Sequence, residues 1–312
     1  MYNAELKKRF TAEYTKSSSV RLLMGKIFNQ FEPFEQEYQK DLCQFDITEL
    51  QAAVDNVLGL RSAGRWSKLS HIRSYIRWCT ENKVAGSVYC FDKLNIAGIE
   101  KFKNSTVANE VDLQRYLDAI YAPEDEHRVD SIIRAYVWLA FCGIPEAALE
   151  SLTKENIILD DMIVSYDGMI KKLYPEALKS IRDAMNLTEF FHDHKNYQTM
   201  MPRFEGNRLL RLGKSDFSVG RLRTYLTTRE KKVNDAGTKT KNLSYGRIYL
   251  SGMFYRIYKL EMAGMEPDFT AITIDERSDR RKKESITKAN MRKDIKAMRE
   301  DYNNWKFSHG YK

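Results

Sequence analysis

The stretch FCGIPEAALESLTKENIILDDMIVSY, residues 141–166, decides the fold of the second half of the chain. Apolar side chains at nearly every position just before it predict a buried helix that ends at Gly143, since glycine often follows the last turn of a helix. Pro145 then opens a short helix, as proline commonly does at the first helical position. Three β-rich runs follow, at 156–160, 162–166 and 169–174. The first two runs predict a hairpin, and the whole stretch predicts helices around a small β-sheet.

Outside this stretch the chain is predicted to be mostly helical. Apolar residues recur at helical spacing in 20–34 and 47–60, and further helices are expected over much of 215–305. The pattern lapses over 102–112, where Asn, Ser and Thr indicate an exposed connection. We therefore predict a mainly α protein with a small β-sheet, in two domains, 1–104 and 105–312. The length of 312 residues suits two domains.

Charge is distributed unevenly along the chain. Residues 1–109 carry 16 Lys and Arg against 12 Asp and Glu, residues 110–202 carry 9 against 17, and residues 203–312 carry 26 against 14. The three net charges, +4, −8 and +12, add to the overall +8. Two basic regions therefore flank an acidic middle, which predicts a polyanion such as double-stranded DNA as partner. A solvated basic surface without a partner is the alternative. The acidic middle, 110–202, is expected to face away from DNA and to meet a second protomer or a regulatory protein.

The sequence also bounds the compartment. No apolar run approaches the ~18 residues of a membrane span, and the N-terminal MYNAELKKRF lacks the apolar core of a signal peptide. The four cysteines are far apart and form no CxxC pair, so we expect buried, reduced thiols. A cytoplasmic protein with no membrane partner is predicted.

The stretch RSAGRWSKLSHIRSYIRWC, residues 61–79, has five Lys and Arg residues and no acidic residue. With Ser67 as N-cap, a helix from Lys68 would turn Leu69, Ile72, Ile76 and Cys79 to one face. The opposite face would carry serines and arginines, which suit a phosphate backbone. Before the helix, Gly64 would supply a turn. The contacts predicted here are Arg61, Arg65, Lys68, Ser70, Arg73 and Arg77.

The order of elements in 110–312 resembles the catalytic domain of tyrosine recombinases, the phage integrases. Gly143, Leu149 and Leu152 match that family's first box, Gly-x-Arg-x-x-Glu-Leu-x-x-Leu, whereas Pro145 and Ala148 occupy its arginine and glutamate slots. The segment HIRSYIRWCTENK resembles the family's core-binding domain.

The family's second box, normally His-x-x-Arg before an aromatic helix, resembles YLSGMFYRIYKLEMAG. That segment has no histidine, and Ser251 and Gly252 stand near the arginine slot. The closest resemblance is to the lytic-cycle repressors of SPbeta-like temperate phages, which are similar to integrases without integrase chemistry.

DNA strand exchange by a tyrosine requires cations placed around the developing phosphorane charge. Because Pro145 offers neither a charge nor an N–H, we predict a protein that is not an enzyme and needs no cofactor. The alternative is a recombinase that uses Tyr302 as nucleophile with Lys172, Arg247 and Arg256. Tyr302 is in phase with Met291, Ile295 and Met298, which favours an apolar seam for it.

Two further predictions concern side chains near the ends of the second domain. The pair His192 and His194 has no other ligands nearby, so no metal site is expected. Tyr311 is expected in a frayed tail.

The resemblance implies a C-shaped clamp of two domains around duplex DNA. The contacts predicted in the second domain are Lys172, Arg208, Arg211, Arg221, Arg223, Lys239, Lys241, Asn242, Ser244 and Arg247. The function expected is sequence-specific binding of double-stranded DNA by a phage repressor that maintains lysogeny. A scaffold with no DNA role is a third hypothesis.

Overall fold

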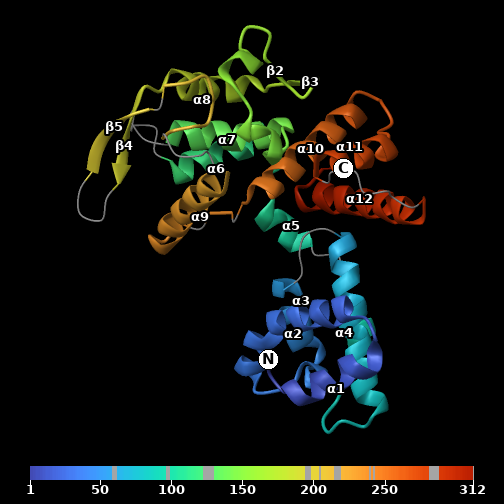
Figure 1. Cartoon of the computed structure of the whole chain (residues 1–312). Coiled ribbons are helices and arrows are strands. Elements are labelled where there is room, and N and C mark those ends of the chain that lie inside the picture. The colour runs from blue at the N-terminus through green and yellow to red at the C-terminus, as the bar shows by residue number, and fades with distance from the viewer. Residues whose placement is uncertain are drawn as a thin grey trace. The chain divides into compact units, whose positions relative to one another are not determined.

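The computed structural model describes the chain except residues 58–61, 96–98, 122–129, 194–197, 204, 214–218, 239, 242, 281–287 and 312. The chain forms two compact units. Unit 1 holds residues 1–102 and 286–307, and unit 2 holds residues 103–285 and 308–312. Figure 1 shows helices throughout, with a few short strands. The predicted fold class, mainly α with a small β-sheet, is confirmed.

Unit 1 is helical in its described part. Its elements are α1 (Ala4–Tyr14), α2 (Ser18–Tyr38), η1 (Leu42–Gln44), α3 (Ile47–Val57), α4 (Ser62–Glu81), η2 (Phe91–Lys93), the start of α5 (Ile99–Ser105) and nearly all of α12 (Lys288–Ser308). The core joins apolar faces of the first four helices, with Phe28, Phe31, Leu50 and Ile72 at most 2% exposed. No sequence pattern predicted that residues 286–307 return to this unit.

Helix α4 begins earlier than predicted. It starts at Ser62, so Gly64 lies within the helix and Ser67 is not its N-cap. Glycine inside a helix costs only about 1 kcal/mol relative to alanine, which the packing of the rest of the helix offsets. The predicted apolar face is confirmed, since Leu69, Ile72, Ile76 and Cys79 are fully buried.

The core of unit 2 is built around α7 (Asp130–Cys142). Eleven consecutive positions, 132–142, are buried except for Arg134, as expected for a helix that is apolar on every side. This helix packs against α8 (Pro175–Asn186) and α10 (Tyr245–Met262). It ends at Gly143, whose φ of +87° is a left-handed conformation that favours glycine. The buried helix and its glycine stop are confirmed.

The predicted sheet has three antiparallel strands. They are β1 (Ile157–Ile158), β2 (Ile163–Tyr166) and β3 (Met169–Lys172), in that order. The register pairs Ile158 with Ile163 and Ile163 with Lys172. Asp167 and Gly168 make the β2–β3 turn with φ of +47° and +77°, the left-handed pair that tight hairpins use.

A second hairpin, β4 (Glu189–Asp193) with β5 (Gln198–Pro202), was not predicted. Its apolar residues occur as adjacent pairs, Phe190 with Phe191 and Met200 with Met201, so the alternation that indicates a strand is missing. The other elements of unit 2 are the end of α5, α6 (Glu110–Ile120), η3 (Glu146–Glu150), η4 (Lys154–Asn156), α9 (Val219–Asp235) and α11 (Phe269–Arg280). None of the described helices is long and apolar enough to cross a membrane.

The C-terminal turn is packed on unit 2, so the predicted frayed tail is wrong. The Tyr311 ring stacks on Tyr258 with centroids 4.3 Å apart, and its hydroxyl donates to the Ala108 carbonyl at 3.2 Å. His309 Nε2 lies 2.9 Å from Thr106 Oγ1. The cysteine prediction holds, since Cys43, Cys79, Cys90 and Cys142 are all buried and unpaired by disulfides.

Candidate nucleic-acid interface

The outward face of α4 carries two exposed arginines that neighbouring side chains hold in place. Arg73 Nε donates to Tyr89 Oη at 3.0 Å, and Arg73 Nη2 donates to Asp92 Oδ1 at 2.8 Å. Arg77 lies over the Tyr89 ring, 5.6 Å from its centroid, and Arg77 Nη2 donates to Tyr89 Oη at 3.3 Å. The two guanidinium groups are therefore ordered before any ligand arrives, which lowers the entropy cost of binding.

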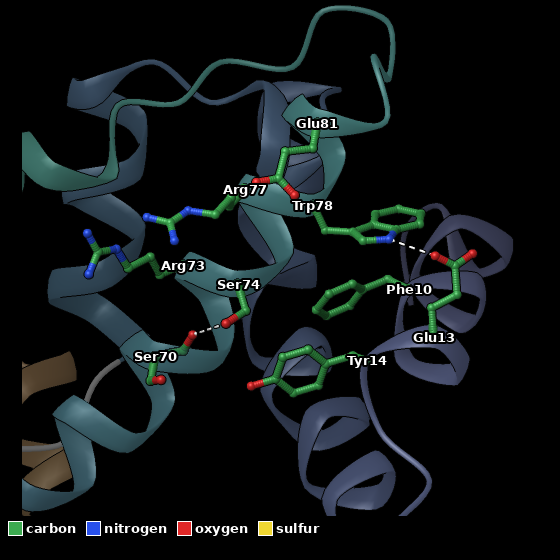
Figure 2. A pocket seen from close by; sticks show the side chains of 9 residues that line it. All are labelled: Phe10, Glu13, Tyr14, Ser70, Arg73, Ser74, Arg77, Trp78 and Glu81. Carbon is green, nitrogen blue, oxygen red and sulfur yellow. Dashed lines mark hydrogen bonds between the residues drawn. The ribbon is translucent and has the colours of Figure 1, made fainter.

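A groove of about 550 Å³ runs between α1 and α4. Figure 2 shows that Arg73 and Arg77 extend from α4 away from Phe10 and Tyr14, which form the aromatic side of the groove. On that side Trp78 Nε1 donates to Glu13 at 2.8 Å, a bond that lowers the pKa of the Glu13 carboxyl. Arg73 and Arg77 line this groove together with the two aromatic residues, so the groove has a cationic side as well as an aromatic side.

Two other predicted contacts on α4 lie deeper. Arg65 is 4% exposed, and its guanidinium carbon lies 5.7 Å from the centroid of the Phe102 ring. Burial lowers the pKa of Arg65, and the nearby carboxylate of Asp301 opposes this shift. Arg65 is therefore packed inside unit 1, and this burial does not suit the predicted DNA contact. Lys68 is partly buried and donates to Gln30 Oε1 at 2.8 Å. Arg61 lies outside the described residues.

Several cations predicted at the DNA in unit 2 already have internal partners. Arg223 on α9 donates hydrogen bonds to both carboxylate oxygens of Glu146, from Nε to Oε1 at 2.6 Å and from Nη2 to Oε2. Lys241 is bonded to the carboxylate of Asp112 and donates to the Thr106 carbonyl at 2.9 Å. The carboxylates of Glu146 and Asp112 therefore neutralise two positive charges that the sequence alone predicted to contact DNA.

The remaining predicted contacts of unit 2 vary in exposure. Arg208 donates to the Glu150 carbonyl, and Arg211 Nε donates to the Gly213 carbonyl at 3.0 Å. Arg247 is half-buried near Glu230, and burial lowers its pKa. The exposed residues among these remaining contacts are Lys172 on β3, Arg208, Arg221 on α9 and Ser244, the N-cap of α10. Lys239 and Asn242 lie outside the described residues.

The slots of the first box hold packing residues. Pro145 is the N-cap of η3, and Ala148 is 6% exposed. Two tyrosines fasten this turn, because Tyr136 donates its hydroxyl to Glu146 at 2.7 Å and Tyr245 donates to the Ile144 carbonyl at 2.6 Å. Burial and the neighbouring Glu146 raise the pKa of the Tyr136 hydroxyl.

The slots of the second box also lie in the interior. Ser251 is fully buried, donates its hydroxyl to the Arg247 carbonyl at 2.8 Å and accepts the Val107 N–H at 3.1 Å. A Cβ at Gly252 would clash with the Phe141 carbonyl, so this glycine is what lets α10 approach α7. Arg256 Nη1 donates to that same carbonyl at 2.6 Å, at the negative end of the α7 dipole.

Tyr302 lies on α12, in unit 1, whereas Pro145, Ser251 and Arg256 belong to unit 2. Its side chain is 1% exposed and stacks on Trp305 with centroids 6.1 Å apart. Met298, one turn earlier, is fully buried too, as an apolar seam requires. Among the described residues, no three His, Cys, Asp or Glu side chains are grouped as metal ligands. His192 is a residue of strand β4, and His194 lies outside the described residues.

Sequence reasoning missed Tyr89, Asp92 and Glu146, the side chains that hold the exposed arginines. Tyr89 lies in a loop and Asp92 in the single turn of η2, both too short for a periodic pattern to mark them, and Glu146 is one acidic residue among many in the acidic middle. No short-range signal identifies these partners, because each contact depends on the tertiary fold.

One comparison with known protein families covers the α4 surface. Residues 1–81 match the family model described as MrpR, N-terminal core-binding domain. The match spans α1 to α4 and therefore contains Arg73 and Arg77, and it confirms the core-binding domain predicted for the N-terminal part. No curated protein sequence matches the chain.

Solved structures of recombinases are similar to the chain at low sequence identity. The crystal structure of XerA recombinase aligns at a TM-score of 0.38 and 11% identity, covering 93% of this chain and 96% of that one. The Tn1549 transposon integrase, residues 82–397, in complex with circular intermediate DNA aligns at a TM-score of 0.38 and 11% identity, covering 93% and 98%.

Proposed function

We propose that this protein binds double-stranded DNA at specific sites, with the outward face of α4 as its main phosphate-binding surface. The observation that carries the proposal is the ordered pair Arg73 and Arg77 inside the segment that matches a core-binding domain. Arginine on an exposed helix face suits phosphate recognition because its planar fork binds two oxygens at once. Ser70 and Ser74 lie on the same face of the helix.

We further propose that the protein performs no strand exchange. Pro145 and Gly252 supply no cation, and Ser251 is buried with both roles of its hydroxyl engaged. The 1% exposure of Tyr302 supports a packing role for the only tyrosine of α12. A suicide DNA substrate tests this point, and we expect no covalent adduct. An adduct that is lost in Tyr302→Phe but retained in Tyr311→Phe would contradict the proposal and favour an active recombinase.

The biological role proposed is that of a phage repressor in a bacterial cytoplasm, holding lytic genes silent. It rests on the resemblance of the degenerate boxes to the repressors of SPbeta-like phages. The test is a pull-down of fragmented phage and host DNA with the purified protein, analysed by sequencing. A few sharp sites upstream of phage genes are expected. One site at a phage–host junction would favour recombination, and a diffuse signal would contradict sequence specificity.

A further inference from the structure

Two leucines in the first half of α2 lie on the surface of unit 1. Leu22 is 63% exposed and Leu23 is 40% exposed, and both lie outside the face of the helix that packs in the core. Lys26 lies one turn after them and is exposed too. Residues 14–31 contain three Lys and Arg residues and no Asp or Glu. This surface, which we call the leucine face, therefore combines apolar side chains with positive charge.

A second apolar surface lies in unit 2, at the corner where α10 ends and α11 begins. Leu260, Met262 and Met265 are all exposed there, Met262 by 69%. Residues 260–274 contain three Asp and Glu residues and no Lys, Arg or His. We call residues 260–268 the methionine corner. It combines apolar side chains with negative charge, the reverse of the leucine face.

Backbone hydrogen bonds give the methionine corner a fixed shape. The Met265 N–H donates to the Leu260 carbonyl at 3.0 Å, and the Gly264 N–H donates to the Glu261 carbonyl at 2.9 Å. This pair of bonds is the Schellman motif, which favours contact between the side chains at the positions of Leu260 and Met265. Asp268 then accepts two backbone N–H groups at the start of α11. Because the corner is formed in the free protein, a partner that binds it has little backbone to order.

Exposed apolar groups with a charged rim are typical of protein-binding surfaces, and methionine adapts its shape to a partner. We propose that the leucine face of one molecule docks on the methionine corner of a second molecule of the same chain. Charge favours this pairing, because two leucine faces would bring cations together and two methionine corners would bring carboxylates together. Among the described side chains, neither Lys26 nor Glu266 forms an ion pair, so both charges are available to meet across the contact.

The pairing joins different surfaces of the two molecules, so each pair keeps one unused leucine face and one unused methionine corner. Further molecules can therefore add head to tail, unless the geometry closes a ring. Both surfaces are small, which predicts a weak association that depends on protein concentration. Neither surface contains Arg73 or Arg77, so the association leaves the face proposed for DNA uncovered. The inference does not depend on DNA binding.

Sedimentation velocity of the full chain over a range of protein concentrations tests the proposal. Leu22→Asp puts a carboxylate opposite the acidic corner, and Met262→Lys puts a cation opposite the basic face. Each variant should weaken self-association at least about tenfold, because like charges then meet in the contact. Higher salt should weaken the association of the wild-type protein. Val88→Asp and Val111→Lys are the matched controls, since both valines are exposed and lie outside the two surfaces.

A mixture of the two variants gives the sharpest result. Leu22→Asp keeps an intact methionine corner, and Met262→Lys keeps an intact leucine face. The mixture should therefore form dimers that cannot grow, although each variant alone stays monomeric at the same concentration.

Four results would overturn the proposal. They are a wild-type protein that is monomeric at every concentration, an unchanged association in either variant, an equal loss in the controls, or a mixture that stays monomeric. A loss in Leu22→Asp alone would place the contact between two leucine faces, and a loss in Met262→Lys alone would place it between two methionine corners. Either outcome contradicts the head-to-tail pairing.

Discussion

Helices α4 and α10 both contain arginine and several aromatic residues, but they lie in different environments. In α4 one face is buried and the other presents Arg73 and Arg77 to solvent. In α10 every position from Ile248 to Phe254 is buried, and Arg256 caps the end of α7. Arginines on a helix therefore indicate a DNA-binding face only where the rest of the helix does not need that face for packing.

The two regions also differ in what holds their exposed cations. Arg77 meets only the ring and hydroxyl of Tyr89 in the contacts described for it, and Arg73 shares that hydroxyl with the exposed Asp92. Arg223, by contrast, is bonded on both sides of its fork by the anchored Glu146. Arg77 thus offers its positive charge directly, whereas Arg73 and Arg223 each share theirs with a carboxylate, that of Asp92 and that of Glu146.

The largest effect is expected from Gly252→Ala, which tests the packing role of α10. An added methyl group must push α10 away from the Phe141 carbonyl, and overpacking of this kind costs about 1–3 kcal/mol. Urea unfolding of the full chain measures the loss. Gly246→Ala is the control, because a Cβ there meets nothing within 4 Å and alanine favours the helix. Equal stability of the two variants would refute the close approach of α7 and α10.

A pH effect is expected at His309, beside the segment 106–109 that packs on α10. Burial, with repulsion from Lys241, lowers the pKa of His309 from 6.5 to about 4. Between these values the unfolded chain binds a proton that the folded chain does not, so stability is complete above pH 6.5 and falls as the pH drops towards 4. Because the ring is only partly buried, we expect a loss of about 1–2 kcal/mol across this window.

His309→Gln should flatten this part of the pH dependence. Thermal unfolding of both proteins between pH 6.5 and pH 4 gives the difference. Burial raises the pKa of Glu35 and of Glu230, and because both proteins contain these two residues, their contribution to the pH dependence cancels. The same slope in both proteins would show that His309 titrates normally in the folded chain.

A smaller effect is expected from Tyr89→Phe, which loosens Arg73 and Arg77 without removing a charge. Loss of the shared hydroxyl should weaken DNA binding about 2–5-fold, the size of one modest hydrogen bond. The salt dependence should stay the same, because the number of neutralised phosphates does not change. Tyr14→Phe, across the groove, is the control. Equal weakening in the control, or a changed salt slope, would contradict the role given to Tyr89.

The sequence predicted the parts of this fold that depend on neighbouring residues. The apolar run of α7, its stop at Gly143 and the hairpin of β1 and β2 each depend on residues close in sequence, and the structure has all three. The prediction that Ser67 caps α4 was wrong, because a good N-cap residue is also tolerated inside a helix when the residues before it favour helix. Local signals thus place elements well and their ends less well.

The parts that were missed depend on contacts between distant residues. Arg223 and Glu146 are 77 residues apart, and His309 and Thr106 are 203 apart. The return of 286–307 to unit 1 and the burial of Arg65 are of the same kind. Nothing near these residues in the sequence carries the information, so charge counting assigned Arg65 and Arg223 to DNA without their internal partners. The predicted domain boundary between residues 104 and 105 has a practical consequence. A fragment that ends at residue 104 would lack the part of α12 that belongs to unit 1.

The most direct test of the α4 surface is a DNA-binding titration over a range of salt concentrations with Arg73→Ala/Arg77→Ala. Lys8→Ala/Arg21→Ala is the matched control, because both residues are exposed and lie in the same unit. We predict at least about tenfold weaker binding and a salt slope lower by about 2 for the α4 variant, with little change in thermal stability. The control should stay close to wild type. A titration of the α4 variant that superimposes on wild type, or an equal loss in the control, would contradict the account.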